Sequence, residues 1–453
     1  MNGRTRIDYD TLVKTDRVHS RVYTDPAIFA DEMEKIFHRG WVFVGHSGEV
    51  PNTGDFRLKR IGSQPIIMVR DQSGKVQLLL NRCRHRGAAV CQYDQGNLRS
   101  FKCAYHGWTY KLDGSLAGVP YPEAYGEDFQ RDEFGLTKVP RVESYRGFIF
   151  ASLSPAGITL KEHLGRSAQE IDLFAGFSDE DEIEVVSGLH KYNFNANWKL
   201  AVENSMDGYH PNVTHESFVA AVMERIKSHP SPEHGKAGFN PDSFSTGGGG
   251  ISKDLGGGHV MLDYGFRIYD PLNGDPLPTV RAINQRGEAH MAEIAARVGA
   301  ERGADGLREG ATHTLIFPNL ILIGLHLRVV QPVSLDYTEV CLYPTTLKWL
   351  APEVNEVRLR SHEAFFGSGS FGGPDDSEIF ERIQTAAAAD LEPWNIISRG
   401  MNHERRDEEG LLVGAMTDEI TQRAIWRQWK KVMTQETGAS ARKRASHAAG
   451  ERG

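Results

Sequence analysis

The sequence predicts an α+β protein that folds as two units, and three observations support this. Its length, 453 residues, exceeds that of a usual single domain. From Phe56 to about Phe150, apolar and polar residues alternate, and Asp71–Gly74 and Asp113–Gly114 have the composition of hairpin turns, which favours a small antiparallel β-domain. After Pro155, helical and strand-like segments are mixed, which is typical of an α+β second unit.

Composition narrows the functional classes. Hydrophobic residues make up 40% and charged residues 25%, as in ordinary folded proteins. The 52 Lys and Arg residues are outnumbered by 60 Asp and Glu residues, so a broad nucleic-acid-binding surface is not expected. The sequence has neither an apolar signal core nor a long apolar run, and we therefore expect no membrane span and a cytoplasmic location. Four cysteines are too few for a disulfide framework.

The chain is expected to divide into four segments. Apolar residues at helical spacing predict a helix between Asp25 and Phe43 that breaks at Gly40. The expected segments are a helical stretch that packs on the second unit (1–40), the β-domain (41–155), the second unit (156–437) and a disordered tail (438–453).

Two glycine runs, Gly247–Gly250 and Gly256–Gly258, surround a short segment. Their spacing is not the G-x-G-x-x-G pattern of a dinucleotide-binding turn between a strand and a helix. We expect a mobile surface loop here and no NAD site in this chain.

A first group of metal-binding side chains lies in the β-domain. Cys83 and His85 form one pair, and Cys103 and His106 form a second pair after seventeen intervening residues. A structural zinc finger usually places two cysteines in one loop and two histidines in the other, so zinc fits this order less well. Two loops that each carry a thiolate and an imidazole suit a binuclear cluster, with both thiolates on one iron and both imidazoles on the other.

The pattern C-x-H-x₁₇-C-x₂-H resembles the Rieske [2Fe–2S] motif. The likeness includes Gly87, after the first ligand pair, and Gly107 and Trp108, after the second. Cys91 and Cys341 lie outside the pattern, and we interpret them as small buried hydrophobic residues.

A second group of candidate ligands follows a predicted helix from Asn197 to Tyr209. Asp207 and His210 would share one face of this helix. Pro211 disfavours helical geometry at His210 and should end the helix there. The chain could then turn and bring His215 back towards His210, so that both imidazoles reach one ion.

This second segment extends the resemblance. Glu203-Asn204, followed by Asp207-x₂-His210-x₄-His215, resembles the catalytic segment of the large (α) subunits of ring-hydroxylating Rieske non-heme iron oxygenases. Members of that family join an antiparallel β Rieske domain to a helix-grip (Bet v1-like) catalytic domain. The resemblance covers about residues 20 to 430, and it implies a Rieske [2Fe–2S] cluster and a mononuclear Fe(II) as cofactors.

The family's iron site needs a carboxylate besides its two histidines. The segment Gly373–Phe380 resembles the block that supplies it. Asp375 is one candidate, although it could instead cap a helix. Asp376 shares a predicted helical stripe with Phe380 and Ile383 and faces the core, where an unpaired carboxylate would be costly. We predict Asp376 as the ligand.

Asp207 has a separate expected role. In the family, the matching aspartate connects an iron-site histidine to a Rieske histidine of the neighbouring subunit, which makes an electron path. The alternative is a helix-surface aspartate without function.

The resemblance implies an oxygenase component that receives electrons from a ferredoxin or reductase and uses O₂ to cis-dihydroxylate an aromatic compound. The Pro-Asp-Asp-x-Glu-x-Phe block resembles that of benzoate, anthranilate and cumate dioxygenases more than that of naphthalene and biphenyl dioxygenases. This resemblance implies an aromatic carboxylate as the substrate. A Rieske monooxygenase or demethylase is the main alternative, and a non-catalytic electron carrier is a further one. The family also implies a trimer, either α₃ or α₃β₃ with a small β-subunit.

Overall fold

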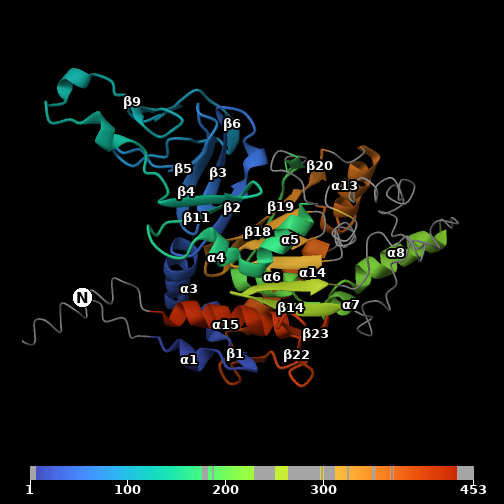
Figure 1. The fold of residues 1–453 in the computed structure, drawn as a ribbon. Coiled ribbons are helices and arrows are strands. Elements are labelled where there is room, and N and C mark those ends of the chain that lie inside the picture. Colours follow the sequence, from blue (N-terminus) through green and yellow to red (C-terminus); the bar gives the residue numbers. More distant parts are fainter. Residues whose placement is uncertain are drawn as a thin grey trace, which may run out of the picture.

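The computed structural model places a small β lobe beside a larger unit built on one long sheet (Figure 1). It describes residues 7–175, 182–185, 188–228, 250–263, 312–323, 326–348, 352–367, 369–370 and 372–435, together with the single residues 296 and 299. The predicted disordered tail, 438–453, lies outside the described residues. None of the helices in the described part of the chain combines the length and apolar character that a membrane crossing needs.

The small lobe is antiparallel, as the alternating pattern predicted. One sheet has the order β5-β4-β3-β6 and a second has the order β7-β8-β9. Their strands are β3 (Asp55–Ile61), β4 (Gln64–Arg70), β5 (Val76–Leu80), β6 (Gln95–Asn97), β7 (Phe101–Lys102), β8 (Thr109–Tyr110) and β9 (Leu116–Gly118). A third sheet, β10-β11-β2, joins the lobe to the larger unit; it contains β2 (Val42–His46), β10 (Arg141–Tyr145) and β11 (Phe148–Ser152).

The larger unit is built on an antiparallel sheet, in which the described residues supply nine strands. Their order is β13-β19-β18-β17-β16-β15-β14-β23-β22. The strands are β13 (His190–Phe194), β14 (Ile251–Gly256), β15 (His259–Asp263), β16 (Thr312–Ile316), β17 (Leu320–Ile323), β18 (His326–Ser334), β19 (Tyr337–Pro344), β22 (Arg405–Arg406) and β23 (Leu412–Ala415).

Helices cover both faces of this sheet. The helices of the larger unit include α4 (Leu160–Leu164), α5 (Ala168–Phe174), α6 (Trp198–Ser205), α7 (Pro211–Thr214), α8 (Glu216–Ser228), α13 (Pro352–Phe366), α14 (Gly372–Ala386) and α15 (Ile420–Thr434). Helix α15 lies against β14 and β15, and its buried Trp426 and Trp429 share a core with Val330 and Val340 of the sheet (Figure 1). The opposite face packs on α4, α5 and the joining sheet. The predicted α+β architecture is therefore confirmed.

The prediction of a loop around the two glycine runs is wrong for its described part. Ile251–Gly256 is strand β14, which pairs with both β15 and β23 inside the long sheet. Gly256, Gly257 and Gly258 have positive φ angles and make the tight turn into β15. The glycines therefore mark a hairpin, and residues 247–249 lie outside the described residues.

The N-terminal segment packs on the larger unit through a buried carboxylate. Helix α3 (Pro26–Glu32) continues into a π-helical turn (Met33–His38) before Gly40. Glu32 is fully buried, and it accepts hydrogen bonds from the indoles of Trp198 and Trp429 and from the Lys199 ammonium (2.7–2.9 Å).

We expect Glu32→Ala to destabilise the protein by about 3–5 kcal/mol, because it leaves a buried ammonium without its counter-ion and two indole N–H groups without an acceptor. Denaturant unfolding followed by tryptophan fluorescence measures this loss. Asp31→Ala on the same helix is the control, since Asp31 is only half-buried. Equal midpoints for the two variants would contradict the prediction.

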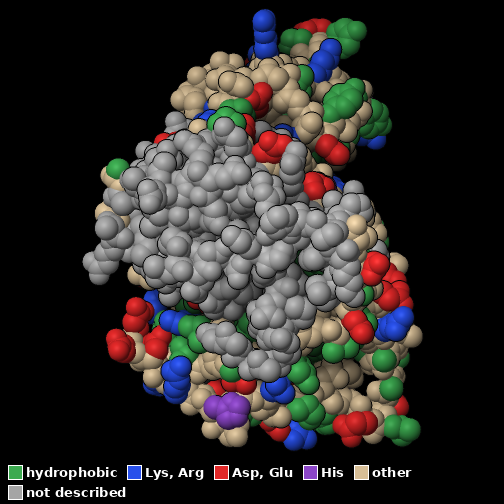
Figure 2. Space-filling view, turned by 90° about the vertical axis from the view of Figure 1, so that its right-hand side faces the viewer, with side chains coloured by type: hydrophobic (Ala, Val, Ile, Leu, Met, Phe, Trp, Pro, Cys, Tyr) green, Lys and Arg blue, Asp and Glu red, His purple; other side chains and the backbone are tan. Residues whose placement is uncertain are grey.

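Charges on the surface are mixed in sign. Figure 2 shows acidic and basic side chains interspersed over the described part of one face.

Candidate functional site

The two predicted ligand loops of the small lobe have the same backbone geometry. In each loop the glycine N–H donates to the cysteine carbonyl (3.0 Å). The cysteine N–H donates to the carbonyl of the residue directly after that glycine, Ala88 for Cys83 and Trp108 for Cys103, both at 2.8 Å. Gly87 and Gly107 have φ values of +79° and +73°, a region that side-chain-bearing residues rarely adopt. The glycines after the ligand pairs are therefore needed to close the loops.

The loops bring their side chains together. Cys83 and Cys103 are buried, while His85 and His106 are half-buried, with ring centroids 4.6 Å apart. The His85 ring stacks on Trp108, and its buried Nδ1 has no hydrogen-bond partner. An unpartnered buried nitrogen beside two free thiols fits the cluster that the motif implies.

A tyrosine in the core of the lobe contacts one of these thiols. The Tyr110 hydroxyl lies 3.2 Å from Cys83 Sγ and accepts a hydrogen bond from the Arg84 N–H. Burial and the contact with Cys83 raise the pKa of Tyr110, so the hydroxyl stays protonated and can donate to a thiolate.

We expect Tyr110→Phe to lower the reduction potential of the cluster, because hydrogen bonds to cysteine sulfur stabilise the more negative, reduced state. A spectroelectrochemical titration measures the potential. Tyr125→Phe is the matched control, since its hydroxyl accepts from the Trp108 indole rather than from a ligand sulfur. An unchanged midpoint in Tyr110→Phe, with the cluster intact, would contradict the role of this hydrogen bond.

The second candidate site is built differently from the prediction. Helix α6 ends at Ser205, so Asp207 and His210 do not lie on its face, and the prediction of a helix to Tyr209 is wrong. Pro211 begins the short helix α7 instead of ending α6. His210 and His215 flank α7 at its two ends, and their ring centroids are 5.4 Å apart.

Contacts from helix α15 explain where α6 ends. Thr421 and Gln422 donate to the Met206 carbonyl (2.7 and 3.2 Å), and these bonds replace those of a further helical turn. Gly208 then passes so close to the Met416 carbonyl that a Cβ atom would lie 2.5 Å from it. The chain can follow this path only with glycine at position 208.

Asp376 faces both histidines. Its Oδ1 atom lies 3.6 Å from His210 Nε2 and 3.3 Å from His215 Nε2, and the three side chains form a group that could hold a metal ion. Asp376 is 6% exposed and His215 is 4% exposed. Two imidazoles and one carboxylate at a single point match the donor set of non-heme iron sites.

Two neighbouring side chains orient this group. Asp375 Oδ2 lies 3.3 Å from His215 Nδ1, which directs the opposite nitrogen of that ring towards Asp376. Asn204 donates from Nδ2 to Asp376 Oδ1 (3.1 Å). Asp375 lies inside α14 instead of capping it. The hydrogen bond of Asn204 joins two segments far apart in the chain, so the local sequence does not reveal it.

The electrostatics of the group suit a cation. Burial acts to raise the pKa of Asp376, but the hydrogen bond with His215 and the nearby histidines outweigh it, so the carboxyl is ionised. Burial acts to lower the pKa of His215, and the two aspartates reverse this effect. The site thus pairs an ionised carboxylate with imidazoles, and a metal ion would take the place of a proton.

Asp207 lies beside His210 at the edge of this group. Its Oδ1 accepts from the Tyr209 N–H (2.6 Å), while Oδ2 lies 3.7 Å from His210 Nδ1. The Asp207 side chain is 30% exposed. Its contacts are therefore compatible with a link between His210 and the surface.

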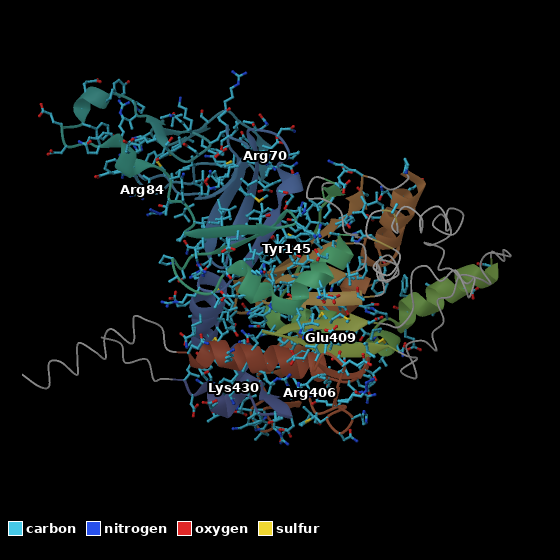
Figure 3. All side chains as sticks on the ribbon, in the orientation of Figure 1. Arg70, Arg84, Tyr145, Arg406, Glu409 and Lys430 are labelled. Atoms are coloured by element: carbon cyan, nitrogen blue, oxygen red, sulfur yellow. The ribbon has the colours of Figure 1, made fainter. Side chains whose placement is uncertain are left out.

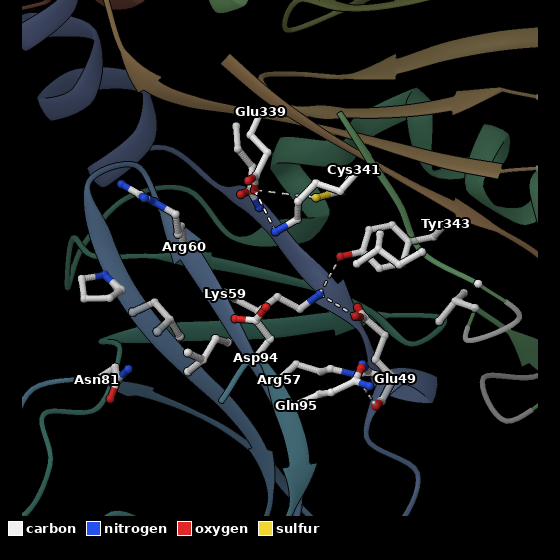
Figure 4. Close-up of a pocket in the computed structure, with 18 residues that line it drawn as sticks. Glu49, Arg57, Lys59, Arg60, Asn81, Asp94, Gln95, Glu339, Cys341 and Tyr343 are labelled. Atoms are coloured by element: carbon white, nitrogen blue, oxygen red, sulfur yellow. Dashed lines mark hydrogen bonds and ion pairs between the residues drawn. The ribbon is translucent and has the colours of Figure 1, made fainter. Parts of the chain in front are cut away.

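A cavity of about 780 Å³ lies elsewhere, where the small lobe meets the larger sheet (Figure 4). Its buried Lys59 pairs with Glu49 (2.5 Å) and with the Tyr343 hydroxyl (3.0 Å), and Lys191 pairs with Glu339 (3.3 Å). These charges already have partners, which indicates a structural role at the junction.

Family models match both parts of the chain. Residues 40–145 match the Rieske [2Fe-2S] domain, and residues 182–435 match the catalytic domain of the ring-hydroxylating α-subunit.

Individual proteins show the same similarity over most of their length. The chain is 35% identical to the large subunit of 2-halobenzoate 1,2-dioxygenase from Burkholderia cepacia, covering 88% of the chain and 83% of that relative. It is 34% identical to the large subunit of anthranilate 1,2-dioxygenase from Acinetobacter baylyi, covering 85% and 80%. A structure of naphthalene 1,2-dioxygenase with indole in its active site matches with a TM-score of 0.79 at 25% identity, covering 96% of each chain.

Proposed function

Since the chain belongs to the α-subunit family of ring-hydroxylating dioxygenases, we propose that it cis-dihydroxylates a small aromatic carboxylate. The family is one of terminal oxygenases, which work with electron-transfer partners and carry a Rieske cluster and a mononuclear iron. The observation that carries the proposal is the convergence of His210, His215 and Asp376 on one point.

In this proposal each domain holds one metal centre. Residues 41–155 form the Rieske domain, and Cys83, His85, Cys103 and His106 hold the cluster. Residues 156–437 form the catalytic domain, where His210, His215 and Asp376 hold the iron. The iron, when bound, would supply the activation of O₂.

Around the iron, the chain's own residues set the geometry. Asp375 holds the His215 ring, and Asn204 holds the Asp376 carboxylate, so neither ligand can turn away. Helix α15 fixes the turn that carries His210.

The distance between the two centres within one chain supports an oligomer. Arg84, which follows Cys83 directly, lies in the projecting lobe in Figure 3, well apart from the place where Figure 1, in the same orientation, labels α7 and α14. We propose that Asp207 links His210 to the His85 or His106 ring of a neighbouring subunit, in a trimer that is either α₃ or α₃β₃. A ferredoxin or reductase would reduce the exposed side of the cluster.

The substrate class rests on the relatives. The 2-halobenzoate, anthranilate and toluate dioxygenases are 33–35% identical to this chain, whereas a phenylurea N-demethylase α-subunit is 28% identical. The first three act on aromatic carboxylates by name, which favours that class here.

The test is turnover of the full chain with a reconstituted electron supply, under ¹⁸O₂, on benzoate, 2-chlorobenzoate, anthranilate and toluene. We expect a cis-diol that carries both labelled oxygen atoms from at least one carboxylate. A product with one labelled oxygen, or a demethylated product, would indicate the monooxygenase alternative. An iron content of about two per chain, instead of about three, would indicate an electron carrier.

A further inference from the structure

A buried arginine without an acidic partner lies on the face of the long sheet that contacts α6. Arg328, on β18, is 5% exposed, and no carboxylate of the described residues lies within ion-pair distance of it. Its Nη1 donates to the Ser205 hydroxyl (2.8 Å), its guanidinium lies 5.3 Å from the centre of the Phe366 ring, and its Nε has no partner. A buried cation without a counter-ion is costly unless a ligand supplies one.

Two buried histidines adjoin this arginine. His326 precedes Arg328 by two residues and so lies on the same face of β18. His362 comes from α13, and the two imidazole centroids are 4.7 Å apart. Both rings are at most 1% exposed, and none of their four nitrogens has a hydrogen-bond partner.

The imidazoles are neutral. Burial, followed by the charges of His190 and Arg328, lowers the pKa of His362 to about 4. Burial, followed by His362 and Arg328, also lowers the pKa of His326. Each neutral ring retains one N–H donor. The three neighbouring side chains therefore combine one positive charge with several donors that have no partner.

This group lies beside the candidate iron site. Ser205, which binds Arg328, is the last residue of α6, immediately before the turn to His210. Phe366 belongs to α13, and the adjacent Phe365 packs edge-on against His215 at 5.0 Å.

We propose that Arg328, together with His326 and His362, binds the carboxylate of the aromatic substrate and so fixes the ring relative to the iron. This inference rests on the proposed function and names the residues that would give it charge selectivity. The guanidinium supplies two parallel donors that match a carboxylate, and the neutral imidazoles supply further donors without adding charge.

A bound divalent cation is the competing occupant. His190, His362 and Glu363 could together hold one. However, His190 Nε2 already lies 2.8 Å from Glu363 Oε1, and the adjacent guanidinium repels a second positive charge. Both observations favour an anion over a cation as the partner of Arg328, His326 and His362.

The test compares benzoate with benzamide, which has nearly the same shape but no charge. In Arg328→Gln, we expect kcat/KM for benzoate to fall by about 10- to 100-fold, the value of a charge-assisted hydrogen bond. The value for benzamide should change little. Arg328→Lys keeps the charge but not the paired donors, so its loss for benzoate should be smaller. Arg60→Gln removes the charge of an exposed residue on β3 and is the control for the loss of a cation.

Calorimetric binding of benzoate to the anaerobic protein separates this inference from the proposed function. If Arg328→Gln binds benzoate with the wild-type Kd, or loses activity equally on both compounds, the carboxylate site is overturned even if wild-type protein dihydroxylates benzoate. If wild-type protein oxidises only neutral arenes and binds no benzoate, both proposals fail.

Two further measurements address a variant that fails to fold and a site that binds a cation. If Arg328→Gln does not fold or load iron, Arg328→Lys and His362→Gln replace it in the test. If the ratio of kcat/KM for benzoate to kcat/KM for benzamide is unchanged in both variants, the proposed carboxylate site is overturned. Metal analysis tests the competing occupant. An additional ion that persists in Asp376→Ala but disappears in His190→Gln would show that His190, His362 and Glu363 bind a cation, and it would overturn the carboxylate site.

Discussion

Replacing Asp376 with alanine is expected to remove the mononuclear iron while the Rieske cluster stays intact. Asp376 is the one carboxylate with an oxygen close to the Nε2 atoms of both histidines, at 3.3 and 3.6 Å, among the residues that the structure describes. Without it, the site offers two neutral imidazoles and loses both the negative charge and one face of the coordination shell. Iron should fall from about three to about two per chain, with loss of activity.

Asp375→Ala is the matched comparison, because the two aspartates are adjacent on α14. Asp375 contacts the far nitrogen of His215, so its loss should weaken iron binding by about 10- to 100-fold without abolishing it. Iron analysis at several free-iron concentrations, with the visible spectrum of the cluster as an internal standard, distinguishes the two variants. If Asp375→Ala is the variant that cannot load iron, the ligand assignment must be exchanged.

The parts of the site that could be predicted are those encoded by short motifs. Each cluster loop contains its cysteine, histidine and glycine within five residues of chain, and the positive φ of Gly87 and Gly107 explains this local pattern. The antiparallel small lobe was predictable for the same reason, since alternation and turn residues are local signals.

The path from α6 to His215 could not be predicted, because distant residues determine it. A proline at position 211 suggested a helix end, yet α6 ends earlier, where Thr421 and Gln422 of α15 take the Met206 carbonyl. The hydrogen bonds that end this helix come from a helix far downstream, and no periodicity near Met206 reveals them.

The burial of Arg328 and the hydrogen bond of Asn204 could not be predicted for a related reason. A single arginine in an apolar strand is read as facing solvent, because charged residues are usually exposed. Only the register of β18 with β17 and β19, together with α6 and α13, shows that its side chain is buried. Asn204 donates its hydrogen bond to Asp376, which lies on α14, far away in the sequence.

Asp207→Asn is expected to impair electron transfer between the two centres while both metals remain bound. The substitution is nearly isosteric, and an amide oxygen can still accept from the Tyr209 N–H, so the turn before His210 should persist. The amide has no negative charge, and its nitrogen cannot accept a hydrogen bond, so the contact with His210 Nδ1 and any bond to a histidine of the partner subunit are weakened. We expect the single-turnover rate to fall by about 100-fold.

The decisive measurement is the oxidation of the pre-reduced cluster on mixing with substrate and O₂, because this rate does not depend on the external electron donor. Asp71→Asn is the matched control: Asp71 also accepts from the backbone N–H two residues later (2.8 Å), but it lies in the hairpin between β4 and β5, away from the candidate iron site. Its rate should equal that of the wild type. Iron content and the visible spectrum should be normal in both variants. If Asp207→Asn oxidises its cluster as fast as Asp71→Asn, then Asp207 only stabilises the turn before His210, and the proposed electron path through Asp207 is wrong.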